Sequence, residues 1–195
     1  MAIKKFKDYG ETKSYGEFPS LPKGGYVLKI LGASVHGNSF GEYIKISCDI
    51  AEGYYSGFFE NDYKNQDAED KKWRCNFLLN VPNDDGTERD GWTKRKFKTV
   101  IEALEDSNTQ YHFDWDEQKF KGLLVGGLFN LREYEKRNGE IGQAVNLAQL
   151  CAVERIRTGK YKLPEDKLFN RPRGPKTDSS GFMSVPEGEE NELPF

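Results

Sequence analysis

The chain has 195 residues, of which 36% are hydrophobic and 31% are charged, and its 29 basic and 32 acidic residues give a net charge of -3. This length predicts one domain, or one domain with a tail. No apolar run approaches the roughly 18 residues of a membrane span, and no apolar segment follows the lysines of residues 1–10, so a membrane partner and secretion are not expected. Three scattered cysteines and two isolated histidines indicate a reducing, cytoplasmic setting without disulfides or a zinc site, and no cofactor is expected.

The charge is divided unevenly along the chain. Residues 177–195 hold five acids and no bases and carry -5, whereas the remaining residues carry +2. Pro172 and Pro175 interrupt regular structure, and Ser, Gly, Pro and Glu dominate from there on. We therefore expect an irregular lead-in at residues 1–20, a folded domain at 21–170 and a flexible acidic tail at 171–195.

Strand patterns dominate the first half of the folded domain. Ile44 and Ile46 alternate with Tyr43 and Lys45, which is the period of a half-buried strand. Strands are expected at residues 26–35, 42–50 and 54–63, the last of these rich in aromatic residues, and residues 71–80 are either a strand or a short helix.

A helix and two further strands follow. The helix is expected at residues 94–106, because Phe97 begins an apolar stripe with the spacing of one helix face. A fourth strand is expected at 121–135, with a bend or bulge at Gly126-Gly127. Asn138-Gly139 predicts a type I′ hairpin turn into a fifth strand at 141–156.

Three strands, a helix and two strands are the element order of the oligonucleotide-binding (OB) fold, a partly open five-stranded barrel. The predicted fold class is therefore mainly β, an OB-fold barrel with a disordered acidic C-terminal tail. Such barrels bind single strands with basic grooves and with aromatic side chains on which bases stack. Phe97 is expected in the core, and Trp73 and Trp92 fit the core as well as a DNA surface. The candidate DNA-binding residues are Tyr43, Lys45, Tyr54, Tyr55, Trp73, Arg74, Trp92, Lys94, Arg95, Arg132, Tyr134 and Lys136.

The end of the chain resembles the C-terminal tip of bacterial and phage single-stranded DNA-binding proteins. Its acids lead into a short apolar end, and the residues concerned are Glu189, Glu190, Glu192, Leu193, Pro194 and Phe195. In that family the tip is a peptide ligand whose Phe enters an apolar pocket of a replication or repair partner, where basic residues hold the carboxylate. The chain departs from the family in having Glu rather than an Asp run, and Leu where Ile is more usual. The resemblance implies that these residues bind a partner protein.

The body is similar to small phage and prophage proteins from replication or recombination gene clusters. The features that carry this likeness are Gly25-Tyr26, residues 96–102, residues 120–122, and residues 153–159 followed by Leu163-Pro164. The likeness implies a non-enzymatic, sequence-independent single-stranded DNA-binding protein in the cytoplasm of a bacterial host. Its tail would recruit replication or recombination enzymes.

Three other functions are compatible with the sequence. The first is a strand-annealing recombination protein, which shares the DNA chemistry. The second is a magnesium-dependent nuclease that uses Asp114, Asp116 and Glu117, because hard cations bind carboxylates. The third is an OB-fold adaptor that binds only proteins. A homo-oligomer is also compatible, because the glycine-rich fourth strand and the long fifth strand offer an edge for pairing.

Overall fold

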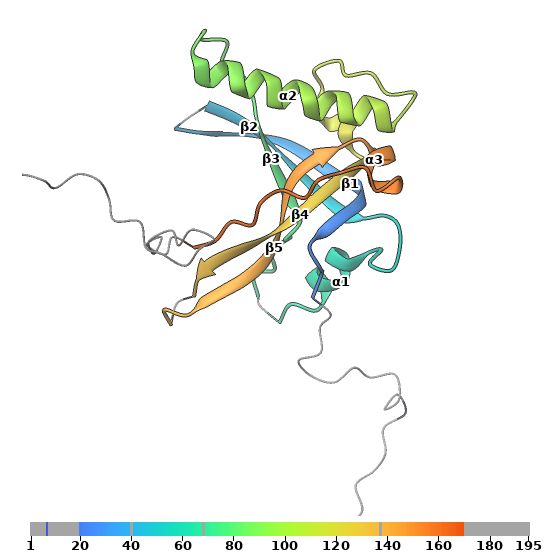
Figure 1. The fold of residues 1–195 in the computed structure, drawn as a ribbon, viewed down its shortest axis with the longest axis vertical. Coiled ribbons are helices and arrows are strands. Elements are labelled where there is room, and N and C mark those ends of the chain that lie inside the picture. Colours follow the sequence, from blue (N-terminus) through green and yellow to red (C-terminus); the bar gives the residue numbers. More distant parts are fainter. Residues whose placement is uncertain (1–6, 8–19, 40, 68, 137, 170–195) are drawn as a thin grey trace, which may run out of the picture.

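The computed structural model describes residues 7, 20–39, 41–67, 69–136 and 138–169 (Figure 1). The tail at 171–195, and all of the expected lead-in except residues 7 and 20, lie outside the described residues. The strands are β1 (Gly24–Asn38), β2 (Gly41–Ile50), β3 (Asn76–Asn80), β4 (Leu124–Glu135) and β5 (Ile141–Cys151). The helices are α1 (Phe58–Lys64), α2 (Glu88–Ser107), the 3-10 helix η1 (Glu117–Phe120) and α3 (Val153–Arg157).

The five strands form one antiparallel sheet in the order β3-β2-β1-β4-β5. β1 has two neighbours, because residues 24–29 pair with β4 and residues 28–38 pair with β2. A register shift between Ile30 and Gly32 lies just beyond the overlap, and such a bulge increases the local twist of a strand. β3 and β5 approach each other, but no ladder joins them in the described residues. The mainly β class is confirmed, whereas the predicted barrel is not closed.

The core lies between the sheet and α2, which crosses one end of the sheet (Figure 1). Ile44 and Ile46 are buried on β2, and the predicted apolar stripe of α2 is buried from Phe97 to Leu104. α2 begins at Glu88 rather than at residue 94, because the Thr87 side chain accepts a hydrogen bond from a backbone N–H of the first turn and caps the helix.

The prediction of a strand at residues 54–63 is wrong, because a turn and then α1 occupy this stretch. Gly53 and Gly57 have left-handed φ values of 86° and 71°, which the extended backbone of a strand does not allow. The carboxylate of Asp49, near the end of β2, accepts a hydrogen bond from the backbone N–H of Phe59 at 3.0 Å and from that of the next residue at 3.1 Å. These bonds satisfy N–H groups at the start of α1. The third strand of the sheet is β3, within the stretch 71–80.

The β4–β5 hairpin is confirmed, but its turn is not of type I′. The Lys136 N–H donates to the Glu140 carbonyl at 2.8 Å, and the Gly139 N–H donates to the Lys136 carbonyl at 2.9 Å. The loop therefore has three residues, with Gly139 at a φ of 80°. This is the three-residue hairpin whose last loop residue is left-handed, rather than the two-residue loop of a type I′ turn.

The predicted fifth strand is too long, because β5 ends at Cys151 and α3 follows. The chain then returns along the part of β4 that extends beyond β1. Lys167 donates its N–H to the Leu131 carbonyl and accepts from the Glu133 N–H, both at 2.8 Å, in a parallel bridge. The Asp166 carboxylate accepts from the Leu131 N–H at 3.0 Å. This segment covers the edge of β4 that β1 leaves unpaired.

The two glycines of β4 mark a close approach of neighbouring side chains. A Cβ on Gly127 would lie 2.4 Å from a methyl carbon of Leu28, and a Cβ on Gly126 would lie 2.7 Å from Ile156. The β4–β5 register shifts between Leu128 and Phe129. The extra residue of this shift is Ala148 on β5, whereas Gly126 and Gly127 pair in regular register with both β1 and β5, so the bulge predicted at the glycine pair is not there.

Candidate nucleic-acid interface

The face of the sheet that points away from the core carries two cross-strand rows on β1, β2 and β3. The first row is His36, Tyr43 and Asn80, and the second is Ser34, Lys45 and Leu78. Residues directly opposite each other in antiparallel strands present their side chains on the same face. None of these six side chains is fully buried, whereas Ile44 and Ile46, which alternate with Tyr43 and Lys45 along β2, are buried. We call these six residues the outer face.

Two aromatic rings stack on the outer face. The ring centroids of Tyr43 and His36 are 5.5 Å apart, and their planes differ by 22°. The Ser34 hydroxyl lies 2.9 Å from Nε2 of His36, within hydrogen-bonding distance, and helps to orient the imidazole. Aromatic side chains on a strand face are the kind of surface on which nucleic-acid bases stack.

Lys45 lies beside this aromatic pair, between Ser34 on β1 and Leu78 on β3. Within the described part of the chain, no acidic side chain forms an ion pair with its ammonium group. Leu78 is 53% exposed and adds apolar surface to the same row. The outer face therefore combines a stacking surface with a cation that can contact a phosphate.

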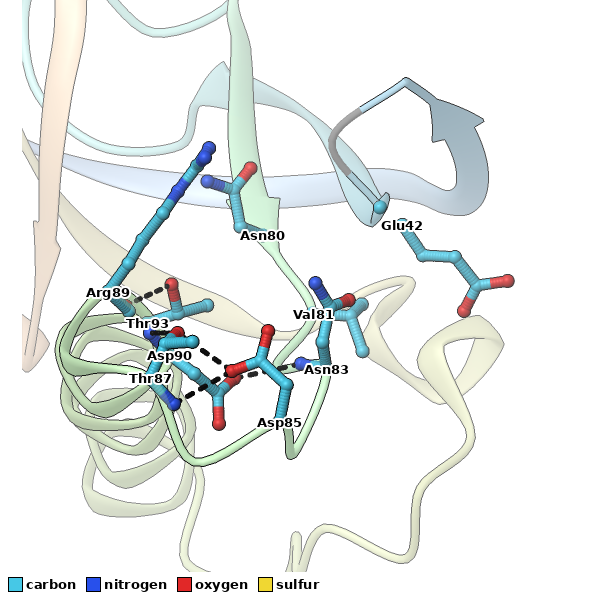
Figure 2. Close-up of a pocket in the computed structure, with 10 residues that line it drawn as sticks. Glu42, Asn80, Val81, Asn83, Asp85, Thr87, Arg89, Asp90 and Thr93 are labelled. Carbon is cyan, nitrogen blue, oxygen red and sulfur yellow. Dashed lines mark hydrogen bonds between the residues drawn. The ribbon is translucent and has the colours of Figure 1, made fainter.

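A polar pocket of about 210 Å³ opens at the Asn80 end of the outer face (Figure 2). Its walls are the start of β2, the end of β3, the turn after β3 and the first turns of α2. Figure 2 shows the Arg89 side chain extending from α2 toward Asn80. The pocket therefore joins α2 to the row that contains Tyr43.

Hydrogen bonds within the chain hold the pocket wall around the start of α2. The Asp85 carboxylate accepts from the N–H and the hydroxyl of Thr87 at 2.9 and 2.7 Å. The Asp90 carboxylate accepts from the Asn83 N–H at 2.9 Å and lies 3.0 Å from the Lys94 ammonium group. The hydrogen bond from Lys94, supported by backbone N–H groups, holds the pKa of Asp90 below its ordinary value. The acids of this wall are thus ionised and engaged by the fold.

Four predicted DNA-binding residues lie near α1 instead. Tyr54 is 92% exposed and meets Tyr55 edge-on at 5.0 Å, while Tyr55 packs against the core. Trp73 also packs against the core, and its indole N–H donates to two backbone carbonyls at 3.0 and 3.1 Å. Arg74 forms an ion pair with an α1 carboxylate at 2.9 Å. Of these four, Tyr54 has the geometry of a side chain available to a ligand.

The other predicted residues occupy α2 and the β4–β5 hairpin. Trp92 is 63% exposed, and the Arg95 guanidinium lies 5.0 Å from its ring centroid. Lys94 pairs with Asp84 and Asp90. On β4, Arg132 lies opposite Ala144 and the Tyr134 ring covers Gly142, while Lys136 pairs with Glu140 at 3.2 Å. Of the predicted residues, Tyr43 and Lys45 are the two that meet on the outer face.

Several residues of this region are absent from the sequence prediction, among them Ser34, His36, Leu78, Asn80 and Arg89. His36 alternates with the apolar residues of β1, and Leu78 and Asn80 alternate with the buried Phe77 and Leu79, so strand period was an available signal. The approach of Arg89 depends on how α2 packs on the sheet, and no local pattern predicts it.

The acids that suggested a nuclease have structural roles. Asp114 pairs with Lys119, and Asp116 accepts from the Gln118 N–H at 3.0 Å at the start of η1. Across the described ranges, no three His, Cys, Asp or Glu side chains gather as a metal site would require.

The predicted partner-binding residues at 189–195 lie outside the described residues. Among the helices that the structure describes, none is both long and apolar enough to cross a membrane. No protein-family model matches the chain, and no curated protein matches it.

Proposed function

We propose that this protein binds single-stranded DNA with little sequence preference through its outer face, in phage replication or recombination. The observation that carries the proposal is the stacked pair of Tyr43 and His36 beside Lys45. Stacking surfaces and cations are the two elements of sequence-tolerant strand binding. The strand order, with α2 between β3 and β4, supports a partly open OB barrel as the fold. The acidic residues at 189–195 would recruit a partner enzyme to the coated strand.

The test is a fluorescence anisotropy titration of labelled oligo-dT at several salt concentrations. We expect affinity to fall as salt rises, because binding releases counterions from phosphates. Tyr43→Ala should weaken binding roughly fivefold to a hundredfold, the range found when a stacking aromatic is removed. Tyr43→Phe keeps the ring and should bind like the wild type. Lys45→Ala should reduce the slope of log affinity against log salt concentration by about one, because one phosphate contact is lost.

Tyr54→Ala tests the competing surface, because Tyr54 is an exposed tyrosine of the sequence prediction that follows the far end of β2 from Tyr43. It should leave the affinity unchanged, and thermal melts should show that all variants are folded. Unchanged affinity in Tyr43→Ala, or a larger loss in Tyr54→Ala, would contradict the outer face as the DNA site.

A further inference from the structure

The polar pocket beside the outer face has the size of a site for a small group. Its volume of about 210 Å³ is below the roughly 300–1,000 Å³ of pockets that hold drug-sized ligands. Asn80 lines it and lies directly across from Tyr43, so one strand spacing of about 4.8 Å separates the pocket from the stacking surface. A nucleotide next to one stacked on Tyr43 is thus within reach of the pocket.

The charges of the pocket favour an uncharged ligand group. Arg89 brings one positive charge, whereas Glu42 and Asp85 bring negative charges to the same walls. Asp90 is already engaged by Lys94 and backbone N–H groups. The Asp85 carboxylate, which faces the other lining residues in Figure 2, would repel a phosphate, whereas a neutral base carries no charge for it to repel.

The hydrogen-bonding groups of the pocket match the edge of a base. The side-chain amides of Asn80 and Asn83 make no hydrogen bond within the described residues, although their neighbours Asp85 and Thr87 do. Each amide offers both donors and an acceptor. Gly41 lacks a side chain, and a Cβ there would lie 2.8 Å from the Asn83 side-chain oxygen, so glycine leaves space for this amide. Asparagine pairs characteristically with adenine, through N6 and N7.

We infer that this pocket holds one base of the bound strand and favours adenine there. The inference rests on the proposed DNA binding and adds to it a single base-selective position, with Asn80 and Asn83 as its hydrogen-bonding residues. Elsewhere along the outer face, stacking leaves binding tolerant of sequence.

The test compares oligo-dT with the same oligonucleotide carrying one central dA, in competition titrations. We expect the dA strand to bind the wild type at least about fivefold more tightly, the lower range for a good two-bond contact to a base. Replacing dA by 7-deaza-dA removes the N7 acceptor and keeps the ring, so it should abolish most of this preference. Asn80→Leu and Asn83→Leu should each remove the preference, and Asn83→Leu, which lies outside the outer face, should keep oligo-dT affinity within about twofold.

Asn61→Leu is the matched control, because Asn61 is exposed on α1, and Figure 1 shows α1 on the opposite side of the molecule from α2, whose first turns line the pocket. It should retain the preference for dA. Oligo-dT binding without a dA preference, or a preference that survives in both pocket variants, overturns this inference and leaves the proposed function standing. Absence of binding to every oligonucleotide overturns the proposed function and this inference together.

Discussion

The hydroxyl group of Tyr111 is buried and has no hydrogen-bond partner among the described residues. Burial, together with the nearby carboxylates of Asp114, Glu105 and Asp116, raises its pKa to about 12. The phenol is therefore neutral at physiological pH and loses its hydration on folding. A buried polar group without a partner costs about 1–3 kcal/mol.

Tyr111→Phe should therefore stabilise the protein. The substitution keeps the ring, which meets Phe120 edge-on at 6.3 Å, and removes only the oxygen. We expect the free energy of unfolding to rise by about 1 kcal/mol and Tm by about 2–4 °C in thermal melts. Tyr54→Phe, at an exposed position, should leave Tm unchanged. A lower Tm for Tyr111→Phe would show that a bound water satisfies the hydroxyl.

The helix α1 depends on a side chain from the strand before it. Asp49 is buried and accepts hydrogen bonds from the first turn of α1. Asp49→Ala should destabilise the protein by about 1–2 kcal/mol, because helix N–H groups lose their acceptor. Hydrogen exchange should increase in α1 first, while β2 stays protected. Asp49→Asn keeps an oxygen acceptor and should show a smaller effect, and unchanged exchange in the Ala variant would contradict the capping role.

The sequence predicts the elements that have a local residue pattern and misses α1, whose first turn is capped by a residue of another element. β2 and α2 follow from local periods, because Ile44 and Ile46 repeat every second residue and Phe97 begins a helical stripe. α1 is missed because aromatic content suggested a strand, although Tyr55, Phe59 and Tyr63 are spaced as on a helix, and because its cap comes from another element. The sheet stays open because β3 and β5 do not pair with each other in the part of the chain that the structure describes. The distance between these two strands depends on the packing of the whole domain, and no local sequence pattern predicts it.

The residues of the candidate site that follow a local pattern are also the ones that the sequence predicts correctly as surface residues. Strand alternation placed Tyr43 and Lys45 on the face opposite the core, and the structure places them there. The basic residues beside Trp73 predict a DNA contact, yet its indole N–H donates to the backbone carbonyls of Cys48 on β2 and of Cys75, the residue before β3. Composition alone does not distinguish an aromatic side chain in the core from one on the surface.

The uneven distribution of charge along the chain predicts that the acidic tail competes with DNA for the folded domain. Removing residues 177–195 changes the net charge from -3 to +2. We expect the shortened chain to bind oligo-dT more tightly at low salt, and the difference to shrink at high salt because charges are screened. Anisotropy titrations of both chains measure this difference.

Deletion of Phe195 alone is the control for this experiment, because it keeps every acidic side chain of the tail. It should leave DNA affinity unchanged while it weakens capture of the partner enzyme. Lower DNA affinity in the chain that lacks residues 177–195 would show that the tail assists binding instead of competing.

The pairing of Lys167 with β4 can form only late in synthesis, after β4 and β5 have been made. Domains fold as the chain emerges from its N-terminus, and β4 and β5 are made before the segment that pairs with Leu131 and Glu133. Until that segment leaves the ribosome, this stretch of β4 keeps an open edge, and open edges invite pairing with other chains. A chain that ends before residue 165 would therefore keep an open edge on this stretch of β4, and that edge could pair with a neighbouring chain.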